Sequence, residues 1–415
     1  MSAGPALCAK RKKAPPPPPL RATLQPSFAI PAEPLGFAAP GPAYLGARES
    51  LVSLDFIGED RLLFTFRVPS LIERNPSQQG NIFERRIRAL VLHLPDGGIE
   101  ADTLWTVHDR DRYVYMLGNG QFLLRDRNML SLGDASLQLK PFLQFPGPVL
   151  AVETDPAAQY LVTISNEPEN QKPAAGTVGS PQTAQAQISQ DDASSTARKN
   201  LVLRILRRDT GKVMLVGRIR DPIHLPINGD GYLEPLRAQG LAWSVDLNHF
   251  DGGRSPAGRV ESICSPVLQF ISAREFLATT CGDQGNPRLV ALSVSGRQLW
   301  DSPPNIPVTW PRLAASANGL RLAWESLLVD HAVNAMAPLG SDDIKGQDVQ
   351  VMDAATGKLV LRAAASPIFD AGGNVAISPS GRRVAIIMEG KVQVFDLPAP
   401  PPVNDSPPAL HRASR

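Results

Sequence analysis

Residues 201–215 read LVLRILRRDTGKVML: an apolar strand, a turn that ends in Gly-Lys, and a second apolar strand. The same phrase returns at residues 349–361 as VQVMDAATGKLVL. A shorter form occupies residues 289–300 (LVALSVSGRQLW), and a looser form occupies residues 87–98 (IRALVLHLPDGG) and runs on to Trp105. Short apolar runs around a Gly turn are typical of β-hairpins, and their recurrence indicates a repeat architecture.

A second set of strand–turn–strand pairs accompanies these phrases and defines seven units. The strands are rich in β-branched or aromatic residues, and the turns contain Gly, Asn, Asp, Pro or Ser. The turns lie roughly 35–50 residues apart once three long insertions are set aside, which is the spacing of four-stranded propeller blades. The pairs are 53–56 with 62–66, 113–116 with 122–124, 150–153 with 160–164, 232–236 with 241–245, 267–271 with 276–280, 313–316 with 321–324, and 374–377 with 384–388.

Two of these stretches resemble repeats of a known class. Residues 378–385 (SPSGRRVA) and 353–360 (DAATGKLV) are similar to repeats of WD40-like, TolB-like and YVTN-type bacterial β-propellers. The resemblance implies an all-β fold, a single seven-bladed β-propeller of four-stranded antiparallel blades, but no particular activity. Trp300-Asp301 lies where the Trp-Asp dipeptide of WD40 repeats would fall. A count of six or eight blades stays open at this stage.

The domain organisation follows from composition. We expect the propeller to span residues 21–397, between disordered Pro-rich tails at 1–20 and 398–415. Long loops are expected at 67–86, 166–200 and 326–347, and the loop at 166–200 is polar enough to be disordered. Each follows the second strand of a unit and precedes the third, so all three should crowd the face that carries the links between blades. Such loops often bind partners, although insertions can also be neutral because they cost little stability.

The last unit lacks a fourth strand of its own. Residues 391–397 supply its third strand, and the following run, Pro398-Ala-Pro-Pro-Pro402, cannot pair in a β-ladder. The N-terminal residues 22–30 contain Leu24, Phe28 and Ile30, and Pro26 suits an edge strand. We therefore expect this segment to close the ring against the seventh blade.

Charge and hydropathy limit the possible partners. The chain has 415 residues and a net charge of +2, which argues against a nucleic-acid binder. It contains no apolar run of about 18 residues that could span a membrane. Residues 1–9 end in small residues and precede the basic run 10–13, so they are either the remnant of a secretory signal or a disordered terminus. The first reading implies a periplasmic or secreted protein, and the second a cytoplasmic one.

The cysteines also bear on whether the protein is exported. If the fifth hairpin turns at residues 272–273, Cys264 and Cys281 lie directly opposite each other across two strands, close enough for a disulfide. The alternative is a pair of reduced, buried cysteines. A bridge would require an oxidising compartment, in agreement with export.

No local motif for catalysis is present. The six histidines show no metal-ligand spacing, and neither a nucleophile elbow nor a phosphate-binding loop occurs. Asn228, Asp230 and Asp246 offer oxygen ligands, but they lack the spacing of a calcium loop and are interpreted as turn residues. We expect no metal and no cofactor. The candidate ligand-binding residues lie in the links that should line the mouth of the central channel: Arg110, Arg112, Asp221, His224, Trp310 and Asp370.

The sequence thus favours a monomeric, non-enzymatic propeller that binds a protein or peptide through its insertion-bearing face. The alternative is a propeller enzyme or small-ligand binder, quinoprotein-like or hydrolase-like, with its site at the channel mouth. Propeller sites can be assembled from residues on several blades, so the missing local motif does not decide between the two.

Overall fold

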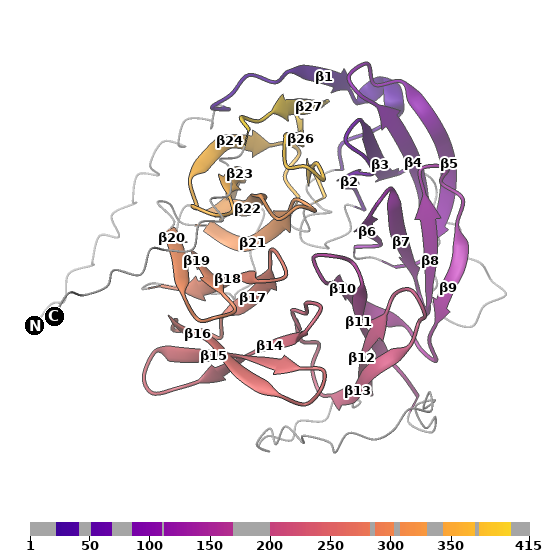
Figure 1. Ribbon diagram of the computed structural model, residues 1–415. Coiled ribbons are helices and arrows are strands. Elements are labelled where there is room, and N and C mark those ends of the chain that lie inside the picture. The colour runs from indigo at the N-terminus through magenta and orange to yellow at the C-terminus, as the bar shows by residue number, and fades with distance from the viewer. Residues whose placement is uncertain are drawn as a thin grey trace, which may run out of the picture.

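The chain forms a ring of seven β-sheets arranged around a central axis in this computed structural model (Figure 1). The structure describes residues 22–40, 51–68, 85–109, 112–168, 200–282, 287–302, 308–329, 343–369 and 373–399. Each sheet is one blade, and all strand pairs within the blades are antiparallel. The seven-bladed β-propeller expected from the sequence is therefore confirmed.

Six of the seven blades contain four strands, which neighbour one another in each sheet in the following order. Blade one contains β2 (Ser53–Phe56), β3 (Arg61–Arg67), β4 (Arg85–His93) and β5 (Ile99–Val107). Blade two contains β6 (Val114–Gly118), β7 (Gln121–Asp126), β8 (Met129–Asp134) and β9 (Lys140–Gln144). Blade three contains β10 (Val149–Thr154), β11 (Tyr160–Asn166), β12 (Leu201–Arg207) and β13 (Val213–Ile219).

The remaining blades follow in the same way around the ring. Blade four contains only β14 (Gly231–Arg237), β15 (Ala242–His249) and β16 (Arg254–Glu261). Blade five contains β17 (Val267–Phe270), β18 (Glu275–Cys281), β19 (Pro287–Ser293) and β20 (Gln298–Ser302). Blade six contains β21 (Val308–Ala315), β22 (Arg321–Val329), β23 (Ile344–Asp353) and β24 (Leu359–Ala365). Blade seven contains β25 (Val375–Ile377), β26 (Arg383–Met388), β27 (Lys391–Asp396) and the N-terminal β1 (Phe28–Pro31).

The N-terminal strand closes the ring, as the sequence predicts. β1 pairs with β27 in the register Phe28↔Val394 to Pro31↔Lys391, so the two ends of the propeller share one sheet. Ile30 and Ala32 are buried in a core cluster together with Leu62 of blade one and Val392 of blade seven. A short 3₁₀ helix, η1 (Glu33–Leu35), follows and buries Leu35 in the same cluster.

Blade four departs from the expected four strands at its inner side. Where the other blades place their innermost strand, the segment 221–228 makes a single isolated bridge, Ile227↔Tyr232. Its two bonds run from the Leu233 N–H to the Pro226 carbonyl and from the Asn228 N–H to the Gly231 carbonyl. Pro222 and Pro226 lack N–H donors, which explains why no continuous ladder forms. β14 is thus equivalent to a second strand, and the predicted pair 232–236 with 241–245 is the second hairpin of its blade, not the first.

The Gly of the recurring phrase packs beneath the outer strand of the preceding blade. Gly97, Gly211, Gly296 and Gly357 all lie in the turn before an outer strand and all have positive φ. A Cβ on Gly97 would meet Ile30, one on Gly211 would meet Leu143, and one on Gly357 would meet Trp300. Gly296 likewise faces Gly258 of β16, which identifies β16 as the outer strand of blade four. The glycine of the recurring motif therefore allows neighbouring blades to pack closely.

We expect Gly357→Ala to destabilise the protein more than a matched change at Gly390. Both residues have positive φ, 68° and 71°, but a Cβ at position 357 would lie 2.7 Å from the Trp300 ring, whereas one at position 390 would meet nothing within 4 Å. Gly390→Ala should cost about 1 kcal/mol of backbone strain, and Gly357→Ala about 2–4 kcal/mol because overpacking adds to it. Urea unfolding of both variants measures the difference, and equal losses would show that the Trp300 contact is unimportant.

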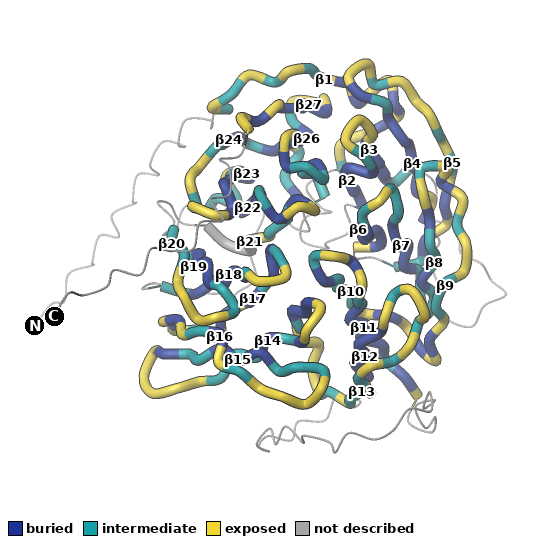
Figure 2. Tube along the Cα trace, viewed as in Figure 1, coloured by how far each residue is buried: buried dark blue, intermediate teal, exposed yellow. Residues whose placement is uncertain are grey.

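Burial follows the position of a strand within its blade (Figure 2). The middle strands β3 and β12 are buried along nearly their whole length, because each is covered by the two neighbouring blades. The outer strand β13 alternates between exposed and half-buried residues, and β5 alternates exposed residues with half-buried or, at its end, buried ones. This is the alternation expected of strands with one covered face and one solvent face.

The three long connections join second and third strands, in blades one, three and six. Residues 69–84, 169–199 and 330–342, which form most of the expected loops, lie outside the described residues, as do the tails 1–21 and 400–415. The third loop is shorter than expected, because Ser326–Val329 pairs with residues 344–348 and extends the ladder. Within the described part of the chain, no helix has the length and apolar character needed to cross a membrane.

Candidate functional site

The structure describes three of the six predicted channel residues completely. Arg110 and Asp370 lie outside the described residues, and for Trp310 only the backbone within β21 is described. Asp221 is exposed at the start of the irregular segment of blade four, and no described contact joins it to Arg112. Arg112 and His224 both contact other parts of the protein, so they are the two predicted residues on which a site can be built.

Arg112 lies at the entry to blade two, and its charge reaches two carboxyl groups that were not predicted from the sequence. Its Nε donates to the Val114 carbonyl at 3.0 Å, and its guanidinium lies over the Tyr115 ring at 5.1 Å. The positive charge of Arg112 acts on both Asp55 of β2 and Glu325 of β22. Residue contacts place β25 between β2 and β22, so the two carboxyls come from blades on either side of blade seven.

Both carboxyls have raised pKa values. Burial raises the pKa of Asp55 to about 6, against the charge of Arg112 and a 2.5 Å hydrogen bond from the Ser53 hydroxyl. Burial raises the pKa of Glu325 to about 7, against the charges of Arg312 and Arg112, and the nearby charge of Asp55 adds to the rise. Two carboxyls that change charge near neutral pH could exchange protons or hold a ligand in a pH-dependent way.

A buried amide network fixes Glu325. The Gln347 amide N–H donates to Glu325 Oε2 and to Asn374 Oδ1, both at 3.0 Å. The Gln347 oxygen in turn accepts from the Phe369 backbone N–H and from the Asn374 amide. The network ties blade six to the link that enters blade seven, so Glu325 has little freedom to move toward a ligand.

We expect Glu325→Gln to remove part of the pH dependence of stability. A carboxyl whose folded pKa of about 7 exceeds its ordinary value of 4.5 takes up protons on folding, so the free energy of unfolding falls as pH rises from 4.5 to 7. The variant lacks this fall. The difference between its free energy of unfolding and that of the wild type should therefore shift in favour of the variant by about 3 kcal/mol between pH 4 and pH 8. Urea unfolding across this range measures the gain, with exposed Glu261→Gln as the control. A gain that stays constant with pH would contradict the assignment.

His224 lies between blades three and five. Its Nδ1 is 2.6 Å from Glu153 Oε1 on β10, and its Nε2 is hydrogen-bonded to the Leu268 carbonyl on β17. The Leu225 N–H also donates to Glu153 Oε2, at 3.2 Å. Both ring nitrogens are therefore used within the protein, and a carboxylate–histidine pair whose outer nitrogen binds a backbone carbonyl has no nitrogen left to act as a base.

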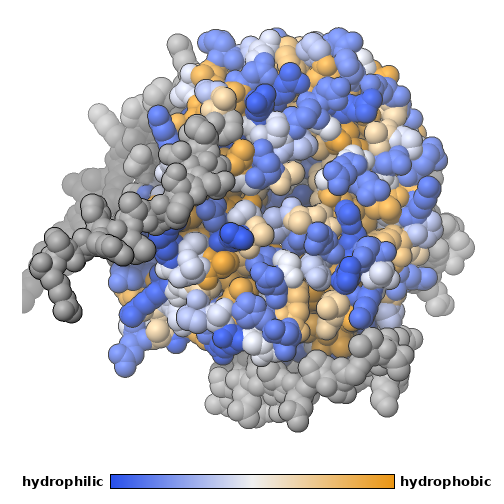
Figure 3. Space-filling model, in the orientation of Figure 1, coloured by the Kyte–Doolittle hydropathy of each residue, from blue (hydrophilic) through white to orange (hydrophobic). Residues whose placement is uncertain are grey.

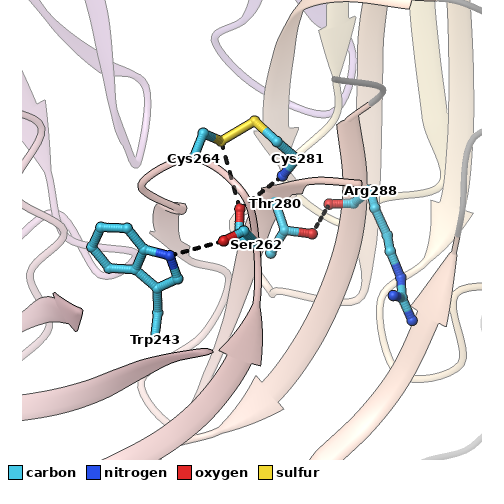
Figure 4. Close-up of a disulfide and its surroundings, with 6 residues drawn as sticks. All are labelled: Trp243, Ser262, Cys264, Thr280, Cys281 and Arg288. Carbon is cyan, nitrogen blue, oxygen red and sulfur yellow. Dashed lines mark hydrogen bonds between the residues drawn. A yellow bond between two sulfur atoms is a disulfide. The ribbon is translucent and has the colours of Figure 1, made fainter. Parts of the chain in front are cut away.

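A disulfide joins Cys264 and Cys281, with the two Cα atoms 5.6 Å apart (Figure 4). The predicted register was wrong by one residue: β17 and β18 pair Val267 with Thr279, and Cys264 lies in the link before β17 rather than in the strand. Ser262 holds this link in place, because its hydroxyl accepts from the Cys281 N–H and its carbonyl accepts from the Trp243 indole.

Three exposed apolar residues lie near this disulfide along the backbone of the link between blades four and five. Leu241, Ile263 and Val267 are 52%, 48% and 55% exposed, and we call them the apolar patch. The Ser262 N–H donates to the Leu241 carbonyl, and the Ile263 N–H donates to the Cys281 carbonyl, so the patch joins blade four to blade five. It lies where β14 turns into β15 and where the chain passes between blades. This is the face that also carries the three long insertions. Over the side of the ring seen in Figure 3, hydrophobic residues are interspersed with hydrophilic ones.

The described residues contain no cluster of three or more His, Cys, Asp or Glu side chains arranged to hold a metal ion. The Asn228 side chain accepts from the Asp230 and Gly231 N–H groups, and Asp246 pairs with Arg254. These contacts agree with the interpretation of residues 228–231 as turn residues.

No protein-family model matches the chain, and no curated protein is similar to it in sequence. Similar solved structures include the acylaminoacyl peptidase of Pyrococcus horikoshii (9% identity, TM-score 0.49, 88% of this chain and 54% of that one). TolB from Acinetobacter baumannii is 15% identical (TM-score 0.38, 80% and 76%), and a chain of the Saccharomyces cerevisiae Dbp5–Nup159–Gle1 complex is 12% identical (TM-score 0.43, 91% and 95%). This chain spans about half the length of the peptidase. With TM-scores below 0.5 and identities below 25%, these likenesses carry no argument about family or activity.

Proposed function

We propose that the protein is a monomeric, non-enzymatic scaffold that binds a protein or peptide through its insertion-bearing face. The observation that supports this proposal is the apolar patch of Leu241, Ile263 and Val267. Exposed apolar side chains that lie together, with polar neighbours around them, commonly mark a surface that a partner covers.

The environment of the patch favours a binding role. Two other exposed apolar residues lie toward the same face: Leu150 near the start of β10, and Ile223 in the link before blade four. The remaining ones, Ile99, Leu104, Met214, Val216 and Leu359, lie along outer strands or at their ends. The Cys264–Cys281 bridge and the Ser262 hydrogen bonds hold the patch rigid. A rigid apolar surface loses little conformational entropy on binding.

The test compares two triple variants with equal numbers of exposed apolar residues replaced. Leu241→Ser with Ile263→Ser and Val267→Ser removes the patch, and Ile99→Ser with Leu104→Ser and Leu359→Ser removes outer-strand residues of similar exposure. Each protein is purified under mild cross-linking from the source cells, and co-purifying proteins are quantified by mass spectrometry. The proposal requires that one or more partners be lost at least tenfold with the first variant and kept with the second. Equal recovery with both variants would refute it.

A second candidate is a small-ligand site at the channel mouth, and the observation that favours it is the group formed by Asp55, Arg112 and Glu325. A pair of carboxyls that titrate near neutral pH beside an arginine is an arrangement also found in ligand-binding and catalytic sites. Thermal shift against a library of small polar metabolites tests this candidate. Shifts that disappear in Arg112→Gln would favour it over the scaffold.

A further inference from the structure

His224 makes two hydrogen bonds to groups that can only accept them in their usual forms. One partner is the Glu153 carboxylate of blade three, and the other is the Leu268 backbone carbonyl of blade five. A carbonyl has no proton to give, so Nε2 must carry one. The contact between Nδ1 and Glu153 needs a second proton, whether it resides on the ring or on the carboxyl. The complete arrangement therefore holds one proton more than a neutral imidazole beside an ionised carboxylate.

This proton has a structural consequence because of where His224 lies. The segment 221–228 replaces the innermost strand of blade four but has almost no ladder of its own. Its other hydrogen bonds include the Leu225 N–H to Glu153, the two bonds of the Ile227↔Tyr232 bridge, and the Asn228 amide to the Ala273 carbonyl. Leu225 and Ile227 also pack in the cluster of blade three. The His224 bridge is the contact through which this segment joins the inner strands of both neighbouring blades.

We propose that His224 is a proton-controlled clamp that holds segment 221–228 against the inner wall of the ring and releases it when the bridge loses its second proton. In the protonated state the segment fills the gap between β10 and β17. In the deprotonated state one of the two bonds is lost, because a single proton cannot serve both acceptors. The segment then opens locally, and Ile223, already 43% exposed, becomes more accessible on the insertion-bearing face. The clamp does not depend on the proposed scaffold function.

The charges around the clamp are few. Glu153 on β10 is the charged group that acts on the ring, and β17 offers the Leu268 carbonyl and no charged residue. Asp155, just beyond β10, is engaged by the N–H groups of Ala157 and Tyr160, and Glu234 on β14 accepts from Asn248. Asp221 is exposed on the segment itself. Burial lowers the pKa of His224, but the Glu153 carboxylate and the Leu268 carbonyl outweigh it, so the net direction is upward from 6.5.

The sign of the pH effect follows from this direction. Since the folded pKa lies above the unfolded one, the clamp contributes its full stability below about pH 6.5 and loses it as pH rises through the folded value. Loss of one hydrogen bond to a charged partner should increase local opening about tenfold.

Hydrogen exchange of the full chain by mass spectrometry tests the clamp, with rates corrected for the intrinsic effect of pH. In the wild type, peptides covering residues 221–233 should lose about tenfold in protection between pH 6 and pH 9, while peptides of β12 stay constant. His224→Gln should exchange at both pH values as the wild type does at pH 9. Glu153→Gln should instead stay protected at both pH values, because its amide N–H can donate to an unprotonated Nδ1 while Nε2–H still donates to the Leu268 carbonyl. His93→Gln, a change at an exposed histidine on blade one, should behave as the wild type.

The same samples give a second measurement that needs no variant to fold. The His224 ring signals, followed by NMR, should titrate above 6.5; they must be told apart from those of His93, whose pKa its hydrogen bond to Asp96 also raises. Constant protection of residues 221–233 across this pH range would overturn the proposal. So would a bridge that has already lost its second proton at pH 6, with a neutral His224 ring beside an ionised Glu153.

Discussion

Removal of residues 1–32 should destabilise the entire propeller, and we expect the largest loss of any change considered for this chain. The deletion removes β1, leaves one edge of β27 unpaired, and takes Ile30 and Ala32 out of the core between blades one and seven. Together these losses should cost about 5 kcal/mol or more, comparable to the whole stability of many domains. Circular dichroism should therefore show either an unfolded chain or a melting temperature lowered by many degrees.

A shorter deletion provides the control. Removal of residues 1–21 leaves β1 intact and should not change the melting temperature. Ile30→Ala keeps the backbone pairing and should cost about 2–4 kcal/mol, because the side chain also covers Gly97 of blade one. A melting temperature unchanged in the longer deletion would contradict closure of the ring by β1.

The second large effect is expected at the ion pair between Glu167 and Arg204 in blade three. The pair is 2.6 Å long and almost completely buried, with side chains 4% and 10% exposed. Burial opposes the charge of Glu167, but Arg204 and the Ser165 hydroxyl outweigh it and hold its pKa below the ordinary value. Glu167→Gln would leave Arg204 charged and without its ionic partner, so we expect a loss of about 3–5 kcal/mol in urea unfolding.

A double variant distinguishes the effect of the unpaired charge from the effect of side-chain packing. Glu167→Leu with Arg204→Met removes both charges and should recover most of the stability lost in Glu167→Gln, since apolar pairs often replace buried ion pairs at little cost. If the double variant were as unstable as Glu167→Gln, packing rather than the unpaired charge would explain the loss. The pair lies where the chain leaves β11 and returns to β12, so it also anchors both ends of the longest insertion.

Much of the fold could be predicted from short-range signals. Gly turns between apolar runs determine hairpins locally, and all seven predicted pairs are hairpins in the structure. The closing strand could be predicted because the proline run 398–402 cannot pair, so another segment had to complete the sheet.

The error in the predicted strands of blade four arises because tertiary contacts, rather than the local sequence pattern, determine the conformation there. Residues 221–228 contain apolar residues at strand-like spacing, but their prolines prevent a ladder, and His224 secures them through side-chain bonds that no sequence period reveals. This shifted the predicted hairpin of blade four by one strand.

The candidate site was only partly predictable for a similar reason. Arg112 was found because it lies in a charged link between blades. Asp55 and Glu325 lie within apolar strands, and their position beside Arg112 depends on the closure of the ring through blade seven. A carboxylate inside an otherwise apolar strand, as in SLDF and LAWESLL, is the signal that could have identified them.

The most direct test of the scaffold proposal is site-specific photo-cross-linking in the source cells. A photoreactive phenylalanine analogue is placed at Ile263 in the apolar patch or at Leu359 at the start of outer strand β24, two positions of similar exposure, 48% and 45%. We predict one or a few discrete cross-linked species from position 263 and none of the same mass from position 359. Identical species from both positions, or none from position 263, would contradict the scaffold proposal.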